Sequence, residues 1–149
     1  MSILAQGTMI VYLLAASVTD IFRKKLSILF LLAGIIPAGI LTISEYFGNG
    51  NSDTVSFILS HVSGLAVGAV FLLISAVTKE GFGKADAVLL CICGAAAGVV
   101  SLISVILFSF LLGAVYSIAM LAMGRLTRKD KFAFVPFILL GYVMMLLLK

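Results

Sequence analysis

Two aspartates, Asp20 and Asp86, each lie at the end of an apolar stretch in a chain that carries few other charges. A carboxylate at the boundary of a membrane is costly and calls for a functional reason. Two such groups a few ångströms apart cannot both ionise cheaply. One can then take a proton from water while the other stays protonated and polarises a carbonyl group. This is the chemistry of an aspartyl protease dyad, and it needs no metal ion or cofactor.

The residues just before Asp86 are small. Gly83 and Ala85 remove bulk beside the carboxylate, so a substrate backbone could approach it closely. Together with Lys84 they are candidate substrate-binding residues. For Lys84 the favoured alternative is a positive charge that only helps to orient the chain in the membrane. Asp86, taken alone, could equally be the N-cap of the helix that follows it.

Asp20 has a simpler alternative as well. Arg23, Lys24 and Lys25 follow it in the sequence and could pair with it as ordinary interfacial charges. For Asp20 considered alone, that alternative is the favoured one. The dyad interpretation therefore depends on the two aspartates being taken together.

Other side chains that could do chemistry are few. Cys91 and Cys93 are one residue apart in an apolar run, which matches neither a disulfide framework nor a C-x-x-C zinc site, so we interpret them as packing residues. The single histidine, His61, is expected to make hydrogen bonds near a helix end. No cluster of metal ligands and no Ser–His pair near a site is evident, so the sequence predicts no metal and no cofactor. Three further acids are expected to be solvated loop charges: Glu45, Asp53 and Glu80.

The composition indicates an integral membrane protein. Of the 149 residues, 63% are hydrophobic and 11% are charged, whereas a soluble domain carries about 25% charged residues. The length fits one transmembrane domain over residues 1–149. The net charge of +4 does not indicate nucleic-acid binding, because the chain has no polar face on which basic residues could gather.

The hydropathy pattern predicts an all-α bundle of six transmembrane helices. A helix that crosses about 30 Å of hydrocarbon needs about 20 residues. The apolar run from Ala87 to Met123 would form a helix of about 55 Å, so we divide it near Gly94–Gly98. Pro37 is expected to kink the second helix. The predicted helices cover residues 3–19, 26–44, 54–78, 86–98, 101–123 and 132–148.

The basic residues predict the orientation. With six spans, nine of the ten lysines and arginines fall in three loops on one side, and only Lys149 falls on the other. The positive-inside rule makes the basic side cytoplasmic and places both termini outside. Asp20 and Asp86 are then both at the cytoplasmic edge of the bundle. The nine residues are Arg23, Lys24, Lys25, Lys79, Lys84, Arg125, Arg128, Lys129 and Lys131.

Two pairs of glycines recur at the G-x-x-x-G spacing that allows helices to approach closely in lipid. Gly64 and Gly68 form the first pair, and Gly94 and Gly98 form the second. We expect both to serve helix packing within the bundle.

Three motifs occur together in order, and each is short. The chain reads Asp20 followed by Ile-Phe-Arg-Lys-Lys-Leu26, then Gly83-Lys-Ala-Asp86, then Phe134-Val-Pro-Phe137 with Gly141 after it. This arrangement resembles the type IV prepilin peptidases, the GxGD membrane aspartyl peptidases that also include the archaeal preflagellin peptidases. The resemblance covers nearly the whole chain and implies that Asp20 and Asp86 are the catalytic residues of an aspartic endopeptidase.

The resemblance also implies a substrate. Members of the family cut prepilin-like membrane proteins between a short basic leader and an apolar helix, next to a small residue, at the cytoplasmic face of a prokaryotic membrane. Larger relatives have an N-terminal extension with paired C-x-x-C motifs and methylate the new terminus, so this sequence implies cleavage without methylation. Three departures bear on substrate fit: Ala85 replaces the second glycine of GxGD, Ser27 and Ile28 replace Pro-Asn, and Ala87 and Val88 follow Asp86.

Two other functions remain open. A small transporter or channel subunit would use the acids to bind ions, and it would place them near the membrane midplane beside a polar stripe. An inactive homologue could serve as an assembly factor of a pilus or secretion system. The sequence names neither the particular substrate nor the oligomeric state.

Overall fold

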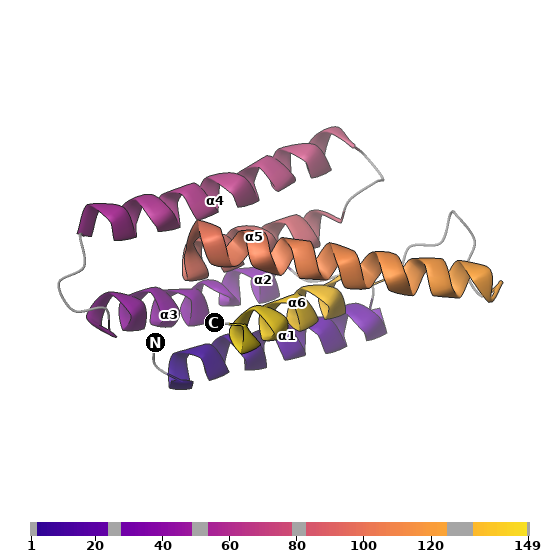
Figure 1. Ribbon diagram of the computed structural model, residues 1–149, viewed down its shortest axis with the longest axis horizontal. Helices are drawn as coiled ribbons and strands as arrows, with labels where there is room; N and C mark the ends of the chain where they lie inside the picture. The colour runs from indigo at the N-terminus through magenta and orange to yellow at the C-terminus, as the bar shows by residue number, and fades with distance from the viewer. Residues whose placement is uncertain (1–2, 24–27, 49–53, 79–82, 125–132, 149) are drawn as a thin grey trace.

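The computed structural model describes residues 3–23, 28–48, 54–78, 83–124 and 133–148, and these residues are almost entirely α-helical. The predicted all-α fold is therefore confirmed. Figure 1 shows the helices lying roughly side by side along one long axis. Their bounds are α1 Ile3–Arg23, α2 Ile28–Ala33, α3 Ile35–Gly48, α4 Thr54–Val77, α5 Lys84–Ala122 and α6 Val135–Leu147.

Among the described residues, four apolar stretches are long enough to cross a membrane. They are Leu4–Phe22, Phe30–Gly48, Thr54–Val77 and Lys84–Ala122. The predicted count of six spanning helices is not confirmed. The segments predicted at 86–98 and 101–123 belong to one hydrogen-bonded element, α5. α6 has only 13 residues, about 20 Å at the usual rise, which is short for a hydrocarbon layer of about 30 Å.

The long helix α5 is nevertheless broken inside. Gly98 has φ 76° and ψ 171°, which is outside the helical region and favours glycine. A Cβ atom built on Gly94 would lie 2.8 Å from Cδ2 of Leu102, whereas residues eight apart in a straight helix are separated by about 12 Å along its axis. α5 therefore folds back on itself, as Figure 1 shows, and it does so within the Gly94–Gly98 segment where the sequence predicted a division.

A second break separates α2 from α3 at Gly34, three residues before Pro37. Proline has no N–H to donate to the carbonyl group four residues earlier, and its ring crowds that carbonyl, so the predicted kink is confirmed. In a bilayer the carbonyl groups that the break at Gly34 leaves open also need partners. The hydroxyl of Tyr12 donates to the carbonyl oxygens of Phe30 and Leu31, at 3.3 and 3.4 Å.

Glycines bring α4 against the first half of α5, as the G-x-x-x-G spacing predicted. A Cβ atom added at Gly64 would lie 3.1 Å from the carbonyl carbon of Gly98, and one added at Gly68 would lie 2.9 Å from the backbone nitrogen of Cys91. There is no room for a side chain at either position. α4 packs mainly along α5, so these two glycines set how closely it docks.

We expect Gly68→Leu to destabilise the folded protein by about 2–3 kcal/mol, because a side chain at this position would force α4 away from α5. Ala69→Leu is the matched control, since Ala69 is the next residue and is exposed. Thermal unfolding in detergent micelles, followed by circular dichroism, measures the difference. Equal unfolding temperatures for the two variants would contradict the close approach of α4 and α5.

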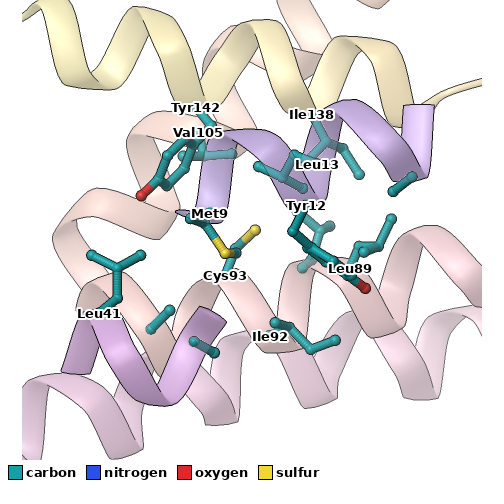
Figure 2. Packing of buried hydrophobic residues seen from close by; sticks show 14 of the residues in the cluster. Met9, Tyr12, Leu13, Leu41, Leu89, Ile92, Cys93, Val105, Ile138 and Tyr142 are labelled. Carbon is teal, nitrogen blue, oxygen red and sulfur yellow. The ribbon is translucent and has the colours of Figure 1, made fainter. Parts of the chain in front are cut away.

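The core ties together the helices that carry the two aspartates. Side chains of α1, α3, both halves of α5 and α6 meet in one cluster (Figure 2). Met9 and Leu13 of α1, Leu89 of α5 and Ile138 of α6 are fully buried there. Because α1, α5 and α6 share this cluster, it holds the end of α1 and the starts of α5 and α6 in fixed positions relative to one another.

The prediction that Glu45 is a solvated loop charge is wrong. Glu45 was expected in a solvated loop, but α3 continues to Gly48, and Glu45 is only 7% exposed. Its Oε2 atom lies 3.5 Å from Nε2 of His61 on α4. The local polarity of residues 45–53 suggested a loop from Glu45 onward, whereas the polar partner that keeps Glu45 inside the fold comes from another helix. Asp53 and Glu80 lie outside the described residues.

Candidate active site

Asp20 lies in the last turn of α1, which ends at Arg23 and not at Thr19 as the sequence predicted. Its carboxyl group is half-buried, and the backbone N–H of Val135, at the start of α6, donates a hydrogen bond to it. Asp20 is thus engaged by another helix. Lys24 and Lys25, its alternative partners in the sequence, lie outside the described residues.

The start of α6 explains why Val135 is available to Asp20. The first N–H groups of a helix have no partner within the helix. Here Pro136 has no N–H, and the N–H groups of Phe137 and Ile138 both donate to the carbonyl oxygen of Phe134. The helix has no side-chain cap of its own. Asp20 therefore takes the role of an N-cap for α6 from a different helix, and the positive end of α6 favours its anionic form.

Asp86 lies in the first turn of α5, at the third position after the N-cap residue Gly83. The alternative in which Asp86 is itself the N-cap is therefore wrong. Its carboxyl group folds back over Gly83: a Cβ atom added at Gly83 would lie 3.2 Å from Cγ of Asp86 and still closer to Oδ2. The glycine thus leaves space that the Asp86 carboxylate itself occupies.

The structure brings these two acids together. Asp20 and Asp86 are 66 positions apart in the sequence, yet their carboxyl groups interact electrostatically across the junction of α1 and α5. Both are half-buried. The charge of the Asp20 carboxylate opposes ionisation of Asp86, in addition to the effect of burial. Such a pair can offer one carboxylate as a base and one carboxylic acid as a proton donor at the same place.

The surrounding chain matches a known family over most of its length. The profile of the type IV leader peptidase family matches residues 8–118, a range that contains both Asp20 and Asp86. The chain belongs to the type IV leader peptidase family. The resemblance stated from the motifs is confirmed, and the apolar helices together with this family indicate a multi-pass membrane protein.

One curated member of the family is similar enough to align in detail. It is the prepilin leader peptidase/N-methyltransferase of Bacillus subtilis (strain 168), which is 37% identical over 82 residues. The alignment covers 54% of this chain and 33% of that protein, so this family member spans only a part of its relative. No solved structure is significantly similar to the chain.

The three residues before Asp86, predicted to bind substrate, lie in different environments. Gly83 and Lys84 are exposed, whereas Ala85 is half-buried and packs against the core. Lys84 opens α5 directly after the N-cap residue, and the part of the chain that the structure describes contains no ion pair between Lys84 and Asp86. Gly83 is thus the member of this group with a defined spatial relation to the candidate dyad.

The remaining candidate residues lie apart from the two aspartates. Cys91 and Cys93 are free thiols, half-buried and buried respectively, on the first half of α5. Nδ1 of His61 lies 2.9 Å from the carbonyl oxygen of Phe57, one turn earlier in α4. Within the described ranges, no group of three or more His, Cys, Asp or Glu side chains is placed to hold a metal ion.

The sequence analysis missed the contribution of Val135, which acts through its backbone. A backbone donor has no residue-type signature. The available signal was Pro136, which often stands in the first turn of a helix and so marks the place where free N–H groups begin. The sequence motif Phe134-Val-Pro-Phe137 is therefore a helix start that faces Asp20.

Proposed function

We propose that the chain is an aspartic endopeptidase of a prokaryotic cytoplasmic membrane that removes the basic leader from prepilin-like membrane proteins. The observation that carries the proposal is the electrostatic interaction between Asp20 and Asp86. Membership of the type IV leader peptidase family supports the reaction class. The similarity to a prepilin leader peptidase supports the substrate class.

In the mechanism that we propose, Asp20 is the general base. The Val135 N–H and the positive end of α6 stabilise its carboxylate form. This carboxylate takes a proton from a water molecule, whose oxygen attacks the carbonyl carbon of the scissile peptide bond. Asp86, as the carboxylic acid, donates its proton to the carbonyl oxygen, and the product of this step is a neutral tetrahedral diol.

The second half of the reaction returns the protons. Asp20, now protonated, donates to the peptide nitrogen as the carbon–nitrogen bond breaks, and Asp86 takes back a proton from a hydroxyl of the diol. A carboxylic acid and an amine leave, and the pair regains its starting state. Gly83 keeps the Asp86 carboxyl group in place, because any side chain there would displace it.

The proposed substrate fits the location of the pair. Asp20, Asp86 and Val135 lie at helix ends that come together at one end of the bundle. Nine of the ten lysines and arginines lie in the sequence segments next to these helix ends. We propose that this end of the bundle faces the cytoplasm and that the chain crosses the membrane six times, with α6 and the first half of α5 as short spans. A basic leader joined to an apolar helix would place its junction at this depth.

The function is tested by cleavage of a defined substrate. The full chain is reconstituted in vesicles with a prepilin-like protein that carries a basic leader, a small residue at the junction and an apolar helix. We expect one cut at the junction, identified by mass spectrometry of both products. The mass of the new N-terminus also shows whether it is methylated. Ion flux through the vesicles without cleavage would favour the transporter alternative.

The proposed orientation predicts which side of the membrane each loop faces. A cysteine introduced at Asn51, in a variant with Cys91 and Cys93 replaced by alanine, is expected to react with a membrane-impermeant maleimide added outside intact cells. A cysteine at Arg128 is expected to react only after the membrane is opened, and serves as the control. The reverse pattern would contradict the cytoplasmic location of the two aspartates.

A further inference from the structure

The short helix α6 has to sit at a defined position along α5, because the N–H of its first residue, Val135, donates to Asp20. A hydrogen bond of this kind needs a nitrogen–oxygen distance of about 2.7–3.2 Å and a nearly straight angle. Figure 1 shows α6 running alongside the second half of α5. Apolar surface alone does not fix where a helix stops along its neighbour in lipid, so the position of α6 depends on steric fit.

One point of fit lies in the middle of α6. A Cβ atom added at Gly141 would lie 2.6 Å from the carbonyl oxygen of Val105 and 3.0 Å from the backbone nitrogen of Ser109, both on α5. The hydroxyl of Ser109 donates to the same carbonyl oxygen at 2.6 Å. Gly141 therefore sets the separation of the two helices, but along the axis it is about 9 Å from Val135.

A second point of fit lies directly before Val135. The ring of Phe134 packs over Gly113 of α5, where an added Cβ atom would lie 3.2 Å from Cε2 and 3.7 Å from Cδ2 of this ring. Gly113 is buried. Phe110, one turn earlier on α5, has its ring centroid 5.3 Å from that of Phe134. The Phe134 ring thus fills a space that is bounded by Phe110 and by the bare backbone at Gly113.

The backbone of Phe134 transmits this fit to Val135. The carbonyl oxygen of Phe134 accepts the N–H groups of Phe137 and Ile138 at 2.9 and 3.3 Å. This carbonyl group and the Val135 N–H belong to one planar trans peptide group, so they point in opposite directions. With the carbonyl group directed into α6 and the ring held on α5, the N–H is directed out of the helix start toward Asp20.

We propose that Phe134 is a positioning residue of the peptidase, whose ring over Gly113 holds the Val135 N–H against the Asp20 carboxylate. The inference rests on the proposed function, in which Asp20 is the general base. Phe134 acts on the chemical step through Val135 and Asp20. Loss of the ring should therefore lower kcat and leave KM nearly unchanged, whereas loss of a ring that binds substrate would raise KM.

Phe134→Leu removes the ring and keeps an apolar side chain. We expect kcat for leader cleavage in reconstituted vesicles to fall by about 10–10²-fold, the usual weight of a hydrogen bond to a charged group. KM should stay within about twofold of its value in the unmodified chain. A normal kcat, or a raised KM with kcat unchanged, would overturn the proposal.

Phe71→Leu is the matched control. Phe71 on α4 is half-buried against the core, as Phe134 is, and its ring centroid lies 6.2 Å from that of Phe110. Both variants lose one ring from the same row, so their thermal midpoints by circular dichroism should fall by similar amounts. Phe71→Leu should nevertheless keep a normal kcat. Equal losses of kcat in the two variants would show that the effect comes from general packing.

Gly113→Ala tests the same contact from the side of α5. The added methyl group would push the Phe134 ring by a few tenths of an ångström, so we expect kcat to fall by about 3–10-fold. In a Phe134→Leu background the same substitution should have little further effect, because the ring that it displaces is absent. Fully additive losses would show that Gly113 and Phe134 act separately, which would contradict the proposal.

The Val135 N–H can also be followed without any cleavage, because Phe134-Val135 is the only Phe-Val pair in the sequence. The full chain in micelles, labelled with 13C at the phenylalanine carbonyl and with 15N-valine, then gives one coupled amide signal. The sequence has no Leu-Val pair, so labelled leucine isolates the same signal in Phe134→Leu.

Exchange of this amide with deuterium should become at least about tenfold faster in Phe134→Leu and in Asp20→Ala, which removes the acceptor. It should stay within about twofold in Phe71→Leu. Normal exchange in Phe134→Leu would overturn the positioning role. Absence of cleavage by the unmodified chain would refute the proposed function, while the exchange rates would still decide whether Phe134 positions the Val135 N–H.

Discussion

Asp86→Asn is expected to lower the rate of leader cleavage by about 10²–10⁴-fold, the usual contribution of a positioned acid or base. An asparagine has the shape of the aspartate but cannot donate the proton that the carbonyl oxygen needs. Asp20→Asn is expected to have an effect of the same size, because an amide cannot take the proton from water. Cleavage of the reconstituted prepilin-like substrate measures both rates.

The stability of the same variants separates loss of chemistry from loss of fold. Asp20 and Asp86 oppose each other electrostatically, so replacing either by a neutral amide removes that opposition. For Asp86→Asn the thermal midpoint should then stay the same or rise while cleavage is lost. Asp20→Asn keeps a side-chain oxygen that can accept from the Val135 N–H but loses the charge that the positive end of α6 favours, so its midpoint should fall slightly. The double variant should be no slower than either single one, because the two groups act as a unit. Full cleavage by a single variant would exclude that carboxyl group from the mechanism.

Gly83→Ala is expected to lower cleavage by about 10²-fold. A Cβ atom at this position would lie 3.2 Å from Cγ of Asp86 and would push the carboxyl group from its place. A displacement of about 1 Å in a catalytic group costs about this much. Gly83 has φ −65° and ψ 126°, which alanine adopts without strain, so the backbone gives no reason for the variant to misfold.

Gly39→Ala is the control for this substitution. Gly39 lies inside α3, and a Cβ atom built there meets no other atom within 4 Å. The control should cleave at the normal rate and unfold at the same temperature or slightly higher, since alanine favours the helix. Normal cleavage by Gly83→Ala would show that the Asp86 carboxyl group is not held in its described position during the reaction.

Both experiments test positions of motifs that the chain shares with the type IV leader peptidase family. At one of these positions the chain differs from the family motif. Ala85 stands where the family motif has its second glycine, and it packs against the core. It therefore has room for a methyl group, whereas Gly83 has none because the Asp86 carboxyl group takes that space. The two glycine positions of the motif therefore differ in the space available for a side chain. The sequence motif alone does not show this difference.

Composition and local patterns are enough to assign the class of the protein and to select the residues worth testing. Mean hydropathy and charge content are sums over residues, so they predict a membrane protein without knowledge of contacts. The break at Gly98 and the kink before Pro37 follow from the backbone preferences of glycine and proline, which are also local. The number of spanning helices does not follow from the sequence in the same way, because the length of an apolar run does not say how deeply each part of it enters the membrane.

Which of these residues meet depends on how the helices pack. Asp20 and Asp86 interact electrostatically although 66 positions separate them, and no local pattern encodes an interaction of that range. Val135 contributes a backbone N–H, which every residue except proline has. Glu45 is polar in sequence but buried in the fold, because its partner His61 comes from another helix. Contacts of this kind arise when helices pack, so they depend on the whole chain at once.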